Sequence, residues 1–127
     1  MLHQKILVPI SLDVRNLKSV RYALALGQRL QAQIYILQHR NAEDTRHSLA
    51  AGLDDALRSL ISNARQAGIN VEHYLVDTNI EEEIVQLARR EQIDLLVFNT
   101  DEHLSERLLF RIKPLVPSQI IQVREKN

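Results

Sequence analysis

The chain has 127 residues, 45% of them apolar and 25% charged, which is typical of one soluble globular domain with a sizeable core. Sixteen basic residues balance sixteen acidic ones, so net charge gives no reason to expect binding to nucleic acid or to an anionic membrane. The chain contains no cysteine, which excludes disulfides, thiolate nucleophiles and cysteine-based metal sites.

Short apolar runs alternate with longer helical patterns, which indicates βαβ units on a parallel sheet. Lys5–Ile10 predicts a first strand whose continuous apolar character fits burial on both faces. Ser11 or Asp13 is expected to cap a helix over 14–30. One stripe of that helix is apolar: Leu17, Val20, Leu24, Gly27 and Leu30. Gln33–His39 predicts the second strand.

A polar loop is expected at 41–47, before a long helix over 48–67 that Gly68 is placed to end. The apolar positions of this helix share one face: Leu49, Leu53, Leu57, Leu60, Ile61 and Ala64. A third strand at 71–76 alternates more and carries charge, as expected of a strand at the edge of a sheet.

The third helix is predicted over 80–91 with Asn79 as its cap. Its first turn carries three glutamates, Glu81, Glu82 and Glu83. Negative charge is stabilising at a helix N-terminus, so we interpret these residues as helix-stabilising and not as a catalytic cluster.

A buried fourth strand is predicted at 94–98, and Thr100 is expected to cap a last helix over 101–112. The fifth strand is predicted at 118–123. Five residues of the predicted strands and helices are expected to be largely buried: Leu7, Leu24, Leu57, Leu96 and Val97.

No catalytic or metal site is predicted. The chain has neither a Walker A lysine loop nor a nucleophile elbow of the G-x-S-x-G type. The histidines do not form the H-x3-H or H-E-x-x-H spacings of zinc sites: His3, His39, His47, His73 and His103.

Glycine is scarce where a phosphate-binding loop would need it. The three glycines are Gly27, Gly52 and Gly68, and none follows a predicted strand. Backbone N–H groups can approach a phosphate closely only where Cβ atoms are missing. The segment after the fourth strand, NTDEHLSERLLFRIKPL, offers side chains and a helix instead.

The chain resembles the universal stress protein family in three segments that occur in the family's order: KILVPIS, YALALGQRLQAQIYILQH and IEEEIVQLARREQIDLLVFNT. The resemblance implies one three-layer α/β/α domain over 1–127. This domain would be Rossmann-like, similar to adenine nucleotide α-hydrolases, with a five-stranded parallel sheet of order 3-2-1-4-5. Many members bind ATP, and members commonly form homodimers.

The ATP-binding branch of the family carries a glycine motif, G-x2-G-x9-G-[ST], after the fourth strand. Its first glycine would fall near Asn99, and the later two have no counterpart here. The family's acidic residue at the end of the first strand falls on Ser11, with Asp13 displaced by two positions. We therefore expect a member of the branch without the ATP motif, a cytoplasmic regulatory or interaction protein with no cofactor and no enzymatic activity.

Alternative interpretations stay open at two places. Ser11, Asp13, Asn99 and Thr100 flank the usual ligand crevice of open α/β sheets, so a degenerate adenine-nucleotide module is the second hypothesis and an enzyme the third. Three cations near the end of the last helix, Arg107, Arg111 and Lys113, either complement the helix dipole or bind an anion or an acidic partner.

Assembly is expected through the fifth strand, an edge in the implied order. Its body has no charge to discourage pairing, and packing beneath the last helix should bury Ile120 or Ile121 but not both. We therefore expect a homodimer in which the two fifth strands pair antiparallel through Gln119, Ile120, Ile121, Gln122 and Val123. No membrane segment is expected either, because no apolar run approaches ~20 residues, and MLHQKILVPIS lacks the pattern of a secretory signal.

Overall fold

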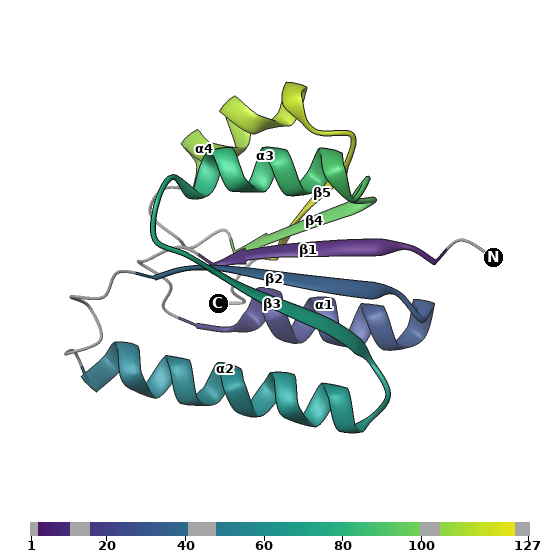
Figure 1. Cartoon of the computed structure of the whole chain (residues 1–127), viewed down its shortest axis with the longest axis vertical. Helices are drawn as coiled ribbons and strands as arrows, with labels where there is room; N and C mark the ends of the chain where they lie inside the picture. The colour runs from purple at the N-terminus through teal and green to yellow at the C-terminus, as the bar shows by residue number, and fades with distance from the viewer. Residues whose placement is uncertain (1–2, 11–15, 41–47, 100–104, 124–127) are drawn as a thin grey trace.

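The computed structural model describes residues 3–10, 16–40, 48–99 and 105–123. One parallel sheet of five strands, ordered β3-β2-β1-β4-β5, runs through the molecule, which confirms the expected fold (Figure 1). The strands are β1 (Lys5–Ile10), β2 (Gln33–His39), β3 (Asn70–Val76), β4 (Leu95–Asn99) and β5 (Gln119–Val123).

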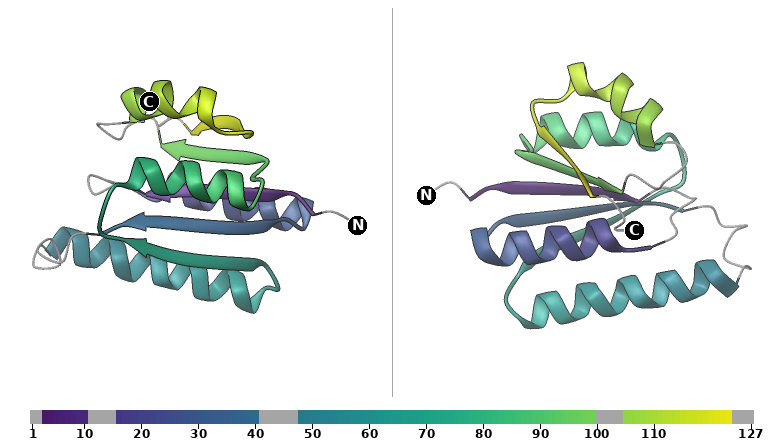
Figure 2. Two further views of the ribbon diagram at one scale, coloured as in Figure 1. Left: turned by 45° about the horizontal axis from the view of Figure 1, so that its top comes forward. Right: turned by 180° about the vertical axis from the view of Figure 1, so that it is seen from behind.

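Two pairs of helices cover the two faces of the sheet (Figure 2). On one face lie α1 (Lys18–Leu30) and α2 (Ser48–Gln66), and on the other lie α3 (Ile80–Arg90) and α4 (Ser105–Ile112). A single 3-10 turn, η2 (Lys113–Leu115), follows α4. Within these described segments, no helix is long and apolar enough to cross a membrane.

Alternation along the strands divides the core into two clusters. Ile6, Val8 and Ile10 of β1 pack with residues of α1 and α2, whereas Leu7 packs with residues of α3 and α4. All five residues predicted to be buried are buried: Leu7, Leu24, Leu57, Leu96 and Val97. Leu24 and Leu57, the two of these residues that lie on helices, belong to the predicted apolar stripes, which explains why the sequence pattern identified them.

The predicted start of α1 is wrong. The helix begins at Lys18, and Leu17 occupies the N-cap without a side-chain hydrogen bond, so neither Ser11 nor Asp13 caps it. The Asn16 side chain accepts a hydrogen bond from Lys18 N at 3.0 Å and so supplies the polar group at the helix start. The helix itself begins four residues later than the expected residue 14. Leu30, the last residue of the predicted apolar stripe, is 42% exposed because it lies in the last turn of α1.

Other helix ends follow the sequence signals. The Asn79 side chain accepts a hydrogen bond from Glu82 N at 3.3 Å, which confirms the predicted cap of α3. Gly68 follows α2 with φ of 88°, a conformation that favours glycine. Gly27 has a different role, because a Cβ there would overlap the end of the Ile34 side chain; its absence lets α1 lie close to β2.

At the β5 edge, the expectation that only one isoleucine could be covered is wrong. Ile120 and Ile121 point to opposite faces, as expected, but each is half-buried against the core cluster on its own side. Residues of α1 contact β5 on one face, and the α3–α4 cluster covers the other. Gln119 and Gln122 are exposed.

Truncation of the core of β4 tests this architecture. Leu96→Ala should lower the free energy of unfolding by ~2–5 kcal/mol, because the fully buried side chain would leave a cavity between central strands and α3. Leu75→Ala is the matched control, since that side chain on β3 is 54% exposed and its loss should cost much less. Urea denaturation measures both, and a loss below about 0.5 kcal/mol at Leu96 would contradict its central position.

Candidate functional site

The candidate site lies where the carboxyl ends of β1 and β4 meet. The strand order reverses between these neighbours, since β2 and β3 lie on one side and β5 on the other. Ligands of open α/β sheets bind at this point. β1 ends at Ile10 and β4 at Asn99, and the amino end of α1 contacts β4 here.

The side chain of Asn99, the last residue of β4, lies at this point and is only 1% exposed. Its Oδ1 accepts a hydrogen bond from Ser19 N at 2.9 Å, and its Nδ2 donates to the Asn16 carbonyl at 3.2 Å. Both ends of the amide therefore bind the start of α1. The first N–H groups of a helix are the donors that an anion would use, and Asn99 already occupies one of them.

Ser19 presents the opposite situation. Its side chain is fully buried, and its hydroxyl is the one buried side-chain polar group in the described part of the chain without a hydrogen-bond partner. Burying an unsatisfied hydroxyl costs about 1–3 kcal/mol. The hydroxyl can therefore donate to, or accept from, a small molecule or water that reaches the start of α1.

The structure brings together different residues from those predicted. Of the four predicted site residues, Asn99 is in the crevice, while Ser11, Asp13 and Thr100 lie outside the described residues. Asn16 and Ser19 were missed. Asn16 carries a recognisable signal, an asparagine shortly before an apolar helical stripe, whereas nothing in the spacing indicates that Ser19 is unsatisfied.

A second polar cluster fastens α2 to the sheet. Gln38 of β2 donates to Asp54 at 2.7 Å and lies 2.9 Å from His73 Nε2, and Arg40 approaches the same aspartate at 3.8 Å. Burial and the neighbouring Arg65 guanidinium lower the pKa of His73, so the ring is neutral near pH 7. Both ends of the Gln38 amide thus have partners within the protein, which is a structural role.

On the other face of the sheet, the hydroxyl of Tyr35 also has its partner within the protein. The Tyr35 hydroxyl donates to Glu91 at 3.0 Å, and its ring stacks on Tyr74 with centroids 6.4 Å apart. Burial, with the hydrogen bond to the carboxylate, raises the pKa of Tyr35, so it is not a base at neutral pH. In the described residues no group of three or more histidine, aspartate or glutamate side chains could hold a metal ion.

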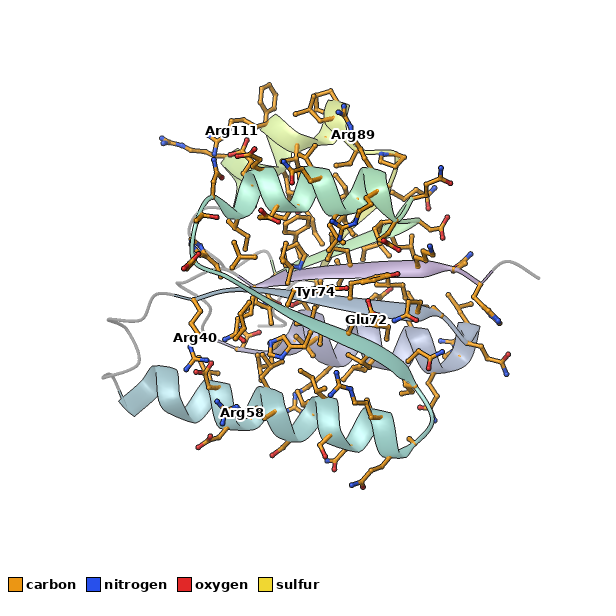
Figure 3. All side chains as sticks on the ribbon, in the orientation of Figure 1. Arg40, Arg58, Glu72, Tyr74, Arg89 and Arg111 are labelled. Carbon is orange, nitrogen blue, oxygen red and sulfur yellow. The ribbon has the colours of Figure 1, made fainter. Side chains whose placement is uncertain are left out.

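The three cations around the end of α4 separate into two kinds. Arg111 forms a bidentate ion pair with Glu81, with Nε–Oε1 and Nη2–Oε2 distances of 2.9 Å, and joins α4 to the first turn of α3 (Figure 3). Arg107 and Lys113 are exposed and make no ion pair with any described residue. Glu81 therefore has a packing role, and the other two charges have no structural use in this part of the chain.

The contribution of Asn99 can be measured by removing its amide. Asn99→Ala removes the two hydrogen bonds that join β4 to the start of α1, so the free energy of unfolding should fall by ~1–3 kcal/mol. Gln122→Ala, at an exposed position of the neighbouring strand, is the control and should change stability by less than about 0.5 kcal/mol. Equal effects of the two substitutions would show that Asn99 does not hold α1.

Comparisons with known proteins identify one family. The profile of the universal stress protein family matches residues 3–111. A search of curated proteins finds no match. Universal stress protein UspA from Lactobacillus plantarum is similar in structure, with 19% sequence identity, a TM-score of 0.70, and coverage of 96% of this chain and 98% of that chain.

Two similar structures contain nucleotides. The universal stress protein from Archaeoglobus fulgidus in complex with dAMP is 16% identical, with a TM-score of 0.65 and coverage of 96% of this chain and 98% of that chain. A family member from Arabidopsis thaliana with AMP bound is 14% identical, with a TM-score of 0.61 and coverage of 97% and 92%. The TM-scores show a shared fold, and the family profile matches most of the sequence: the chain belongs to the universal stress protein family.

Proposed function

We propose that this chain is a non-catalytic regulatory protein of the cytoplasm that acts as a homodimer and does not depend on bound ATP. The observation that carries the proposal is the position of Asn99, which satisfies the start of α1 with a side chain of the protein itself. A protein whose crevice is filled in this way would exert its function through its surface.

Two features of the chain disfavour phosphate binding at the start of α1. In the ATP-binding branch the glycine motif begins just after the fourth strand, whereas here β4 ends in a buried asparagine. A phosphate could reach the Ser19 N–H only by displacing the Asn99 amide, which would also break the hydrogen bond from Asn99 Nδ2 to the Asn16 carbonyl. The sequence after Gly68 also contains no glycine whose backbone could approach a phosphate closely.

The second candidate function is adenine-nucleotide binding with a degenerate phosphate loop, through Ser11, Asp13, Asn99 and Thr100. Two observations favour it. Similar structures have been solved with dAMP and with AMP bound, and the Ser19 hydroxyl is buried without a partner beside Asn99. A monophosphate needs fewer backbone donors than a triphosphate, so this candidate predicts preference for AMP over ATP.

Calorimetric titration separates the two candidates. We expect ATP with Mg²⁺ to bind no tighter than roughly 1 mM, which corresponds to about −4 kcal/mol, because Asn99 competes for the helix donors. AMP should be titrated in parallel as the smaller ligand. A micromolar Kd for either nucleotide, or nucleotide retained through purification, would contradict the first candidate and support the second.

The homodimer is proposed through β5 because that strand is an edge of the sheet. In the described part of the chain no strand pairs with the outer side of β5, and no charged residue or proline lies between Gln119 and Val123. Since Ile120 and Ile121 are half-buried by the chain's own helices, backbone pairing rather than exposed apolar area would supply most of the contact.

A charged residue on this edge should break the dimer. We expect Ile121→Lys to convert a sedimenting dimer into a monomer or an aggregate, because two-fold pairing would bring both lysines to the same contact. Leu75→Lys places the same charge on the opposite edge, at a position 54% exposed, and should leave the dimer intact. Circular dichroism melting checks that the variants fold, and a wild-type monomer at tens of micromolar would contradict the assembly.

A further inference from the structure

The outer side of α4 and the turn that follows it form an exposed surface with an unusual composition. We call it the α4–η2 surface and define it by Arg107, Phe110, Lys113, Pro114 and Leu115. Arg107 and Phe110 are three residues apart in α4 and so lie on one side of that helix, and Lys113, Pro114 and Leu115 form the turn that follows it. The inner side of the same helix is buried through Leu109 and Ile112.

Phe110 is the clearest anomaly of this surface. Its side chain is 85% exposed, the largest exposure of any large apolar residue in the described part of the chain. The other phenylalanine, Phe98, is 1% exposed. Leu115, five residues further on, is 43% exposed. A single exposed aromatic residue is common, but Phe110 shares α4 with the exposed Arg107 and precedes by four residues Pro114, which lines a groove.

The groove lies beside η2, at the amino ends of β4 and β5, whereas the candidate site lies at the carboxyl ends of β1 and β4. Its volume is about 490 Å³, and its walls include Arg89, Asp94, Pro114, Leu115 and Pro117. Arg89 is fixed there because its Nε donates to the Leu115 carbonyl at 2.8 Å. The wall of the groove is thus apolar on the η2 side and carries the Arg89 guanidinium on the α3 side. Figure 3 places Arg89 on the same side of the molecule as Arg111.

The α4–η2 surface carries positive charge. Arg107, Arg111 and Lys113 occur in the stretch from Arg107 to Val123, which contains no carboxylate. Glu81 neutralises Arg111, but in the described structure Arg107 and Lys113 have no acidic partner and Arg89 binds only a carbonyl. Three cations of this region, Arg89, Arg107 and Lys113, are therefore not paired with a carboxylate in the described part of the chain, and Asp94 is the single carboxylate among the residues that line the groove.

We propose that the α4–η2 surface docks an acidic segment of a partner protein, with one bulky apolar side chain against Phe110 and Leu115 and carboxylates facing Arg107, Lys113 and Arg89. Charge complementarity supplies the specificity, and the apolar contact supplies much of the affinity. This inference rests on the proposed regulatory function, because it names the surface through which such a protein would act.

Two other occupants fit less well. A second copy in an isologous contact would bring Arg107 and Lys113 toward their own counterparts, which places like charges together. A nucleic acid would bring a phosphate backbone to the groove, where Asp94 would repel it, and a single aromatic side chain offers little stacking. A peptide tolerates Asp94, since a backbone N–H or a lysine can face that carboxylate.

Selection from a random peptide library tests the proposal without knowledge of the partner. Displayed peptides of about 12 residues, long enough to occupy one groove, are selected on the full-length protein. We expect enriched peptides to combine aspartate or glutamate with one bulky apolar residue. In fluorescence anisotropy, Phe110→Ser and the double variant Arg107→Glu/Lys113→Glu should each weaken binding of the best peptide about tenfold or more.

Tyr22→Ser is the matched control, because Tyr22 is an exposed aromatic residue of α1, on the other face of the sheet, and its loss should change binding less than about twofold. Enriched peptides that are basic, or that bind Phe110→Ser normally, would overturn the proposal. A dimer that Phe110→Ser converts to a monomer would assign the surface to a second copy. Phe110-dependent binding of single-stranded RNA would assign it to nucleic acid. None of these results depends on the nucleotide titration, so the two proposals fail separately.

Discussion

The hydrogen bonds of the Asn99 side chain are the interaction on which the candidate site depends. One amide at the end of β4 satisfies both the Ser19 N–H and the Asn16 carbonyl, and so positions the first turn of α1 against the centre of the sheet. This arrangement fixes the helix start and uses a donor that a phosphate would otherwise bind. The same two hydrogen bonds therefore order the helix start and, in the proposed function, disfavour a phosphate there. A glycine at this position could supply neither hydrogen bond.

Most of the fold was predictable because its signals are local and repeated. The strands were recognisable as continuous apolar runs, and Asn79 and Gly68 marked helix ends through the chemistry of single residues. The strand order came from the family resemblance and not from the pattern of residues. At the start of α1 the local signal of Asn16 was overlooked, and the hydrogen bond from Ser19 N to Asn99, 80 residues away in sequence, has no local signal at all.

The site itself was predictable only as a location. The strand ends identified the crevice and Asn99, but the direction of the asparagine side chain, into the protein and not toward a ligand, is a tertiary property. The burial of both Ile120 and Ile121 was missed for a similar reason, since it depends on how far the helices on each face extend toward β5. The pattern of cations near the end of α4 was visible, yet only the structure shows that Glu81 compensates Arg111 while Arg107 and Lys113 stay exposed.

The central claim is that Asn99, and not a ligand phosphate, occupies the N–H of Ser19. Nuclear magnetic resonance of the Ser19 amide during titration with Mg²⁺ and ATP tests it directly, because both its chemical shift and its hydrogen exchange report on its partner. The account predicts a protected amide whose shift does not change up to about millimolar ATP, and whose protection is lost in Asn99→Ala. A Ser19 resonance that shifts and saturates at micromolar ATP would contradict it.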